Sequence, residues 1–263
     1  MDKFANYMSE KTVQKKKKIK TILVSQPEPT AENSPYIALA ENEKVKIDFR
    51  PFIYVEGATA RDIRKQKIAL PDYNAIIFTS RNAVDHFFRL AEEMRYTVPN
   101  TMRYYCQSEA IAYYLQRYIV YRKRKISYGN KTISDLANII SKNPQGKFLL
   151  PSSDKLKPEI PAALNKIGIN WKSATFFKTK ISDLSDLKDV YYDILVFYSP
   201  SGIESLYKNF PDFEQNDTRI AVYGKSTVEA AKEKGLRIDI MAPTPETPSM
   251  TMALQKYIRE SNK

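Results

Sequence analysis

Two serine-containing turns have the residue types and spacing in this chain that best suit the binding of an anion. Ser80 ends the apolar run 73–80, and Ser199 ends the similar run 192–199, 119 residues later. Each run is rich in β-branched and aromatic residues and is followed at once by apolar residues at helical spacing. This pattern predicts a buried parallel strand, a turn and a helix. Unpaired amides at a helix start carry partial positive charge and suit carboxylates or phosphates.

Further small, basic and hydroxyl-bearing residues fall at the predicted turns. They would add anchors for an anion at the edge where open α/β sheets bind ligands. The candidate binding residues are Thr79, Ser80, Arg81, Ser108, Ser199, Ser201, Gly202, Gly224, Lys225, Ser226 and Thr227. Serine and threonine are also preferred N-cap residues, so a structural role is the competing interpretation for each hydroxyl.

Other residues that could carry chemistry favour structural interpretations. The run 224–227 superficially resembles the end of a phosphate-binding loop, but no glycine lies between Gly202 and Gly224, which excludes that motif. The single histidine, His86, falls inside a predicted helix and favours a partly buried structural residue over a base. Cys106 lies between a strand and a helix, where a thiolate could be favoured, but a small core residue is the preferred interpretation. One histidine and one cysteine cannot form a usual zinc site.

Length and composition set the class of protein. A chain of 263 residues with 43% hydrophobic residues suits two modest α/β domains or one large one. A single cysteine excludes a disulfide framework. No apolar stretch approaches the roughly 20 residues that cross a bilayer, and the N-terminus lacks an apolar signal core. We therefore expect a cytoplasmic protein with no membrane contact.

The net charge of +12 indicates an anionic partner without identifying it. Seven lysines and two acidic residues fall within 1–20, and we expect residues 1–18 to form a disordered basic tail. Tyrosines and basic residues cluster between 104 and 125, which suggests either a nucleic-acid patch or, preferably, a helix face and an amphipathic edge strand. Composition alone leaves both nucleic acid and a small polycarboxylate open.

The repeat of strand, turn and helix extends through both halves of the chain. Alternating strands and helices predict parallel sheets, and the fold class is α/β with two similar lobes and a cleft in which both serine turns face one ligand. Extended runs at 45–54 and 174–180 flank the first repeat unit, so one lobe should be discontinuous in sequence. The predicted boundaries are lobe 1 at 19–48 and 181–260, lobe 2 at 55–174, and linkers at 49–54 and 175–180.

Four turn motifs resemble those of one enzyme family. The runs 77–84, 197–202, 221–227 and 242–248 occur in the order seen in the uroporphyrinogen-III synthase family, and the resemblance covers about residues 20–258. It implies a bilobal monomer that works without a cofactor. The implied reaction is the cyclisation of hydroxymethylbilane, a linear tetrapyrrole polycarboxylate, to uroporphyrinogen III. Water is lost and ring D is inverted, in a lyase step of tetrapyrrole (heme) biosynthesis.

Two positions depart from that family's pattern. A tyrosine proposed to assist loss of the hydroxyl is replaced by Phe177, which cannot donate a proton, so another donor such as Tyr198 would have to substitute. The turn 106–109 lacks the usual glycine, which puts close approach of a ligand to its backbone in doubt. Two alternatives therefore remain open: a non-catalytic bilobal protein that binds an anion, and a basic protein that binds nucleic acid.

Overall fold

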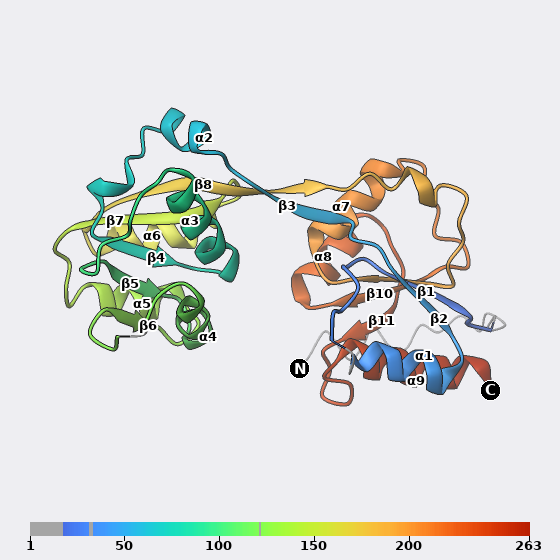
Figure 1. Cartoon of the computed structure of the whole chain (residues 1–263). Coiled ribbons are helices and arrows are strands. Elements are labelled where there is room, and N and C mark those ends of the chain that lie inside the picture. The colour runs from blue at the N-terminus through green and yellow to red at the C-terminus, as the bar shows by residue number, and fades with distance from the viewer. Residues whose placement is uncertain (1–17, 32–33, 121) are drawn as a thin grey trace. The chain divides into compact units, whose positions relative to one another are not determined.

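The computed structural model describes residues 18–31, 34–120 and 122–263 (Figure 1). Apart from Lys18, the predicted basic tail lies outside the described residues. The chain divides into two compact units. Unit 1 contains the described residues up to Tyr54 together with Ile181–Lys263, and unit 2 contains Val55–Lys180. The predicted α/β class is confirmed, with two sheets of parallel strands, one of them built from both ends of the chain.

Unit 1 is a five-stranded sheet with helices on both faces. The strands are β1 (Thr21–Val24), β2 (Lys46–Phe49), β9 (Ile194–Phe197), β10 (Arg219–Tyr223) and β11 (Ile238–Ala242). They lie in the order β11-β10-β9-β1-β2, and every neighbouring pair is parallel. The helices are α1 (Pro35–Glu43), α7 (Pro200–Asn209), α8 (Lys225–Glu233) and α9 (Met250–Asn262).

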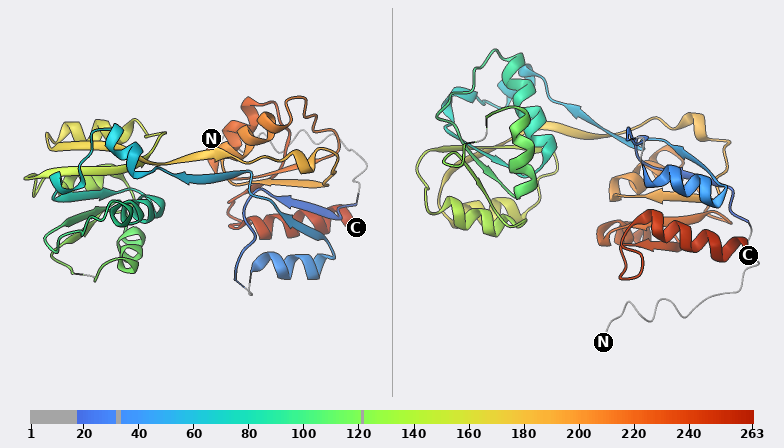
Figure 2. Two further views of the ribbon diagram at one scale, coloured as in Figure 1. Left: turned by 45° about the horizontal axis from the view of Figure 1, so that its top comes forward. Right: turned by 60° about the horizontal axis from the view of Figure 1, so that its bottom comes forward.

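Alternate residues of the unit 1 strands enter two separate cores. Val24 and Val196 pack with residues of α1 and α9, whereas Leu23 and Leu195 pack with residues of α7 and α8. The two views in Figure 2 show the α1–α9 pair and the α7–α8 pair with the sheet between them. Burial on both faces explains why these strands are almost wholly apolar.

Unit 2 is a six-stranded sheet of similar design. Its strands are β3 (Ile53–Gly57), β4 (Ala75–Phe78), β5 (Arg103–Cys106), β6 (Ile126–Tyr128), β7 (Lys147–Ser153) and β8 (Asn170–Ile181), in the order β3-β8-β7-β4-β5-β6. The start of β3 and the last residue of β8 fall within unit 1. Its helices are α2 (Ala60–Lys65), α3 (Arg81–Glu93), α4 (Glu109–Tyr114), α5 (Ile133–Ile140) and α6 (Glu159–Lys166). The pairs β4–β5, β4–β7, β5–β6 and β7–β8 are parallel.

The extended run predicted at 45–54 is two strands rather than one. β2 ends at Phe49 and β3 begins at Ile53, with Pro51 between them. Proline has no amide hydrogen to give to a sheet, which accounts for the break. The predicted linkers 49–54 and 175–180 overlap the start of β3 and the second half of β8, and Thr175 pairs with Ser152 of β7. The linker boundaries remain a prediction.

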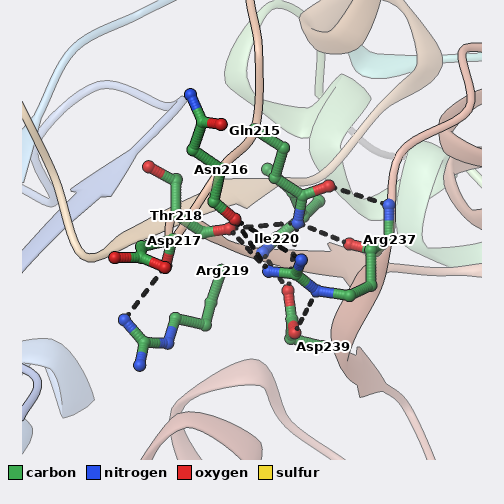
Figure 3. Close-up of polar contacts among 8 residues, drawn as sticks. All are labelled: Gln215, Asn216, Asp217, Thr218, Arg219, Ile220, Arg237 and Asp239. Carbon is green, nitrogen blue, oxygen red and sulfur yellow. Dashed lines mark hydrogen bonds and ion pairs between the residues drawn. The ribbon is translucent and has the colours of Figure 1, made fainter. Parts of the chain in front are cut away.

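A polar cluster fixes the register of β10 and β11 where these strands begin (Figure 3). The pairing shifts directly after Ile220 and leaves Asp239 without a strand partner. The Asp239 carboxylate instead accepts from the Ile220 amide at 3.0 Å, from Gln215 Nε2 at 3.2 Å and from Arg237 Nε at 2.9 Å. Arg237 also donates to the Asn216 carbonyl oxygen. The polar groups of this cluster therefore form hydrogen bonds with one another, and their role is structural.

Candidate functional site

The carboxyl edge of the unit 1 sheet has a topological switch point between β1 and β9. From β1 the chain continues to β2 on one side, and from β9 it continues to β10 on the other. Ligands of open α/β sheets bind at such points. The Ser25 amide donates to the Val196 carbonyl at 3.0 Å. A Cβ atom added to Gly202 would lie 3.6 Å from Ser25 Oγ and 3.7 Å from Ser199 Oγ, so these three residues meet at the switch point.

Ser199 and Ser80 both cap the helix that follows them. Ser199 Oγ accepts from the Gly202 amide at 3.2 Å, and Ser80 Oγ accepts from the Ala83 amide at 3.1 Å. Both serines have the extended backbone of an N-cap residue. Their structural role is therefore present, and a role in ligand binding would have to use the second lone pair or the hydroxyl proton. Ser25 is not among the predicted binding residues, although it too follows a short apolar strand.

The start of α8 differs from that of α7 because it has no side-chain cap. Its N-cap is Gly224 at φ +83°, where an added Cβ would meet nothing within 4 Å. Lys225 and Ser226 are exposed, whereas Thr227 is 1% exposed and packs into the unit. The amides of this first helical turn are thus left for solvent or an anion. Gly224 permits the positive φ angle and leaves space for a ligand to approach these amides.

Two tyrosines form a hydrogen-bonded pair at the same edge of unit 1. Tyr198 lies between β9 and Ser199, and its hydroxyl oxygen is 2.5 Å from that of Tyr36 in α1. Burial raises the pKa of both phenols, so both are protonated across the physiological range. Tyr36 is not among the predicted site residues, since no local pattern connects residues 162 positions apart.

The candidate residues of unit 2 have surroundings that suit an anion less well. The guanidinium of Arg81 lies over the Tyr114 ring, 5.4 Å from its centroid. Ser108 precedes α4 without capping it and lines a hollow of about 800 Å³. Glu109, Asp135 and Lys131 line the same hollow, so two carboxylates outweigh one ammonium group there and disfavour an anionic ligand. Thr79 and Ser80 are partly exposed.

Phe177, His86 and Cys106 occupy structural positions in unit 2. Phe177 is 7% exposed and stacks on His86 with ring centroids 5.1 Å apart. Burial and then the charge of Arg89 lower the pKa of His86, so it is neutral at pH 7. Burial raises the pKa of Cys106 to about 12, which leaves no thiolate at neutral pH. The structural interpretation of His86 and Cys106 therefore agrees with their surroundings.

The described part of the chain has neither a cluster of metal-binding side chains nor a membrane-spanning helix. Within residues 18–31, 34–120 and 122–263, no three His, Cys, Asp or Glu side chains gather in a group that could hold a metal ion. Over the same residues, every helix is too short or too polar to span a bilayer.

Comparisons with known proteins point to one family. Residues 34–252 match the family described as uroporphyrinogen-III synthase HemD. A solved uroporphyrinogen-III synthetase from Helicobacter pylori is similar with a TM-score of 0.59 at 19% identity, over 92% of this chain and 100% of that one. A mutant uroporphyrinogen III synthase from the extremely thermophilic bacterium Thermus thermophilus has a TM-score of 0.57 at 16% identity, over 92% and 99%. No curated protein sequence matches the chain.

Proposed function

The chain belongs to the uroporphyrinogen-III synthase family, and on that premise we propose that it cyclises hydroxymethylbilane to uroporphyrinogen III with inversion of ring D and loss of water. The observation that carries the proposal is the family match over residues 34–252. The two solved structures support the fold alone at their low identity. The net charge of +12 suits a polycarboxylate substrate.

The chemistry asks the protein chiefly to hold a flexible chain in a folded conformation. Proximity and orientation can supply roughly 7–11 kcal/mol of a barrier reduction. In unit 1, the uncapped start of α8 and the meeting of Ser25 with Ser199 at the switch point offer amide and hydroxyl donors for substrate carboxylates. We assign substrate binding to this edge, together with the exposed Lys225.

The decisive experiment measures the isomer produced. Hydroxymethylbilane generated enzymatically closes spontaneously to the type I isomer, so type III product above that background demonstrates the activity. Failure of the wild-type chain to produce any excess of type III overturns the proposal.

A charge reversal tests the assignment to the carboxyl edge. Lys225→Glu should raise KM about tenfold, equivalent to about 1.4 kcal/mol, because it places a carboxylate where a substrate carboxylate binds. Lys188→Glu is the matched control, since Lys188 is also exposed in unit 1 but lies before β9 and not in a turn that joins a strand to the helix after it. Equal KM values for the two variants would remove Lys225 from the site.

A non-catalytic anion-binding protein is the second candidate, and one observation favours it. Phe177, at the position of a proposed catalytic tyrosine, has no hydroxyl and is buried against His86. This candidate predicts binding of hydroxymethylbilane with no excess of type III product. Nucleic-acid binding, the third alternative, predicts affinity that falls steeply with salt.

We also propose that the chain acts as a cytoplasmic monomer. Light scattering after size-exclusion chromatography tests the oligomeric state, and cell fractionation tests the compartment. A stable dimer or a membrane-bound fraction would contradict the corresponding part.

A further inference from the structure

Only one of the two hydroxyl protons of Tyr36 and Tyr198 takes part in the hydrogen bond that joins them. Two phenols bring two O–H donors, and the bond of 2.5 Å between their oxygens consumes one of them. Within the described residues, neither hydroxyl makes any other hydrogen bond. The second O–H of this partly exposed pair is therefore free to donate to solvent or to a bound ligand.

Neighbouring rings hold both phenols in place. Tyr36 meets Phe49 edge-on with ring centroids 5.3 Å apart, and the Tyr198 ring lies 5.4 Å from that of Tyr223. Tyr198 also directly precedes Ser199, the cap of α7. The second hydroxyl proton of the pair is thus held by well-packed side chains at the switch point to which substrate binding is assigned. A general acid has to be positioned in this way.

We propose that Tyr198 is the catalytic residue that protonates the departing hydroxyl of the substrate, and that Tyr36 is a positioning residue that stabilises the Tyr198 oxygen. This inference rests on the proposed function. Of the two phenols, Tyr198 gives up a proton more readily. Burial raises the pKa of both, and the shared hydrogen bond then lowers that of Tyr198 and raises that of Tyr36.

The proton balances over the whole reaction. The Tyr198 O–H bond breaks as its proton passes to the substrate hydroxyl oxygen, the C–O bond breaks, and water departs with the bonding pair. The pyrrole nitrogen supplies electrons to the carbon left behind, which gives a cationic azafulvenium ion whose charge balances the Tyr198 phenolate, and Tyr36 donates its hydrogen bond to that phenolate. The ring D carbon that already carries a bridge bonds to this cation and gives a spiro intermediate, and its older C–C bond then breaks. The released bridge carbon bonds to the unsubstituted carbon of ring D, which inverts the ring, and that carbon loses the proton that restores Tyr198. No external oxidant, reductant or base is needed.

Three phenylalanine substitutions test the pair in the full chain. Tyr198→Phe should lower kcat for type III product about 100-fold with KM within twofold, since positioned general acids contribute roughly 100-fold or more. Tyr36→Phe should lower kcat about tenfold. Tyr192→Phe is the matched control, because Tyr192 is a partly buried tyrosine of the same unit that donates to Asp48 at 3.0 Å, and its kcat should stay within twofold.

Chemical rescue separates proton donation from packing. Tyr198→Ala should regain type III activity at least tenfold on addition of phenol and not on addition of benzene, which fills the same space without a proton. Loss of less than threefold in Tyr198→Phe, or equal rescue by benzene, overturns the proposal. Should Tyr198→Ala not fold, the split between kcat and KM in the two phenylalanine variants decides it. A wild-type chain without type III activity overturns the proposed function itself, a result distinct from an active chain that tolerates Tyr198→Phe.

Discussion

The two units contain the same strand–serine–helix turn but place different side chains beside it. β4 leads to Ser80 and β9 leads to Ser199, and the two capping bonds differ by only 0.1 Å, at 3.1 and 3.2 Å. The residue before the serine is Thr79 in unit 2 and Tyr198 in unit 1. The repeated turn thus determines the backbone geometry, whereas the adjacent residue determines whether a proton donor stands there.

The amino edges of the two sheets, where the strands begin, differ in the hydrogen bonds that stabilise them. Asp193 directly precedes β9, and Asn74 directly precedes β4. Asp193 is 5% exposed, and its carboxylate accepts from the amides of Lys20 and Thr21 at 2.8 and 3.0 Å. Asn74 is exposed and accepts one bond, from the Lys147 amide at 3.0 Å. Unit 1 joins distant parts of the chain, and its amino edge has the stronger set of side-chain hydrogen bonds.

The largest effect on stability that we expect comes from removing the side chains of Asp193 and Asn74. Asp193→Ala should lower the free energy of unfolding of unit 1 by about 3 kcal/mol, because the amides of Lys20 and Thr21 and the Thr21 hydroxyl lose their charged, buried acceptor, and Asn74→Ala should cost unit 2 about 1 kcal/mol. Hydrogen exchange of each unit measures both. The single tryptophan, Trp171, lies in β8, so its fluorescence reports unit 2. Equal losses in the two variants would contradict the difference between the two amino edges.

Removal of the two caps should have equal effects. Ser199→Ala and Ser80→Ala should each cost about 1 kcal/mol of stability in their own unit, the usual cost of losing an N-cap. Chemical denaturation followed by hydrogen exchange measures the two losses. If Ser199→Ala also lowers type III turnover beyond what its stability explains, whereas Ser80→Ala does not, Ser199 binds substrate as well as capping α7.

A pH dependence should affect unit 2 alone through His86, the only histidine in the chain. Burial, followed by the charge of Arg89, lowers its pKa below the ordinary 6.5, so the folded state favours the neutral ring. The unfolded chain therefore binds a proton first, and unit 2 should lose stability as the pH falls through 6.5. Trp171 fluorescence during denaturation at pH 7.5 and 5.5 measures this. His86→Gln should remove most of the difference, and an unchanged difference would contradict the assignment.

The smallest effect that we expect is that of Phe177→Tyr. Phe177 is buried in the core of unit 2 and stacked on His86. A hydroxyl added there should leave type III turnover within twofold of wild type, because Tyr198 already supplies the proton. A rise of tenfold or more would mean that the proton donor belongs at residue 177 and would remove Tyr198 from that role.

The sequence was sufficient to predict the fold class and the serine turns, because both depend on local patterns. The strand at 194–197 and the turn at Ser199 could be predicted from neighbouring residues alone. The approach of Tyr36 to Tyr198 could not be predicted, since it depends on β1 and β9 becoming neighbours in the sheet. Burial also escaped prediction: Thr227 has the spacing of a binding residue but is almost fully enclosed.

The discontinuity of unit 1 has a consequence for the newly made chain. Asp193 lies 172 residues after Thr21, and a ribosome that has released β1 must synthesise that whole stretch before β9 can begin to pair. At roughly 5–20 residues per second, β1 waits about 10 to 30 seconds with one side unpaired. All of Val55–Lys180 is made during that wait. Translation therefore supplies a complete unit 2 first and leaves the oldest strand as the one most in need of protection from aggregation.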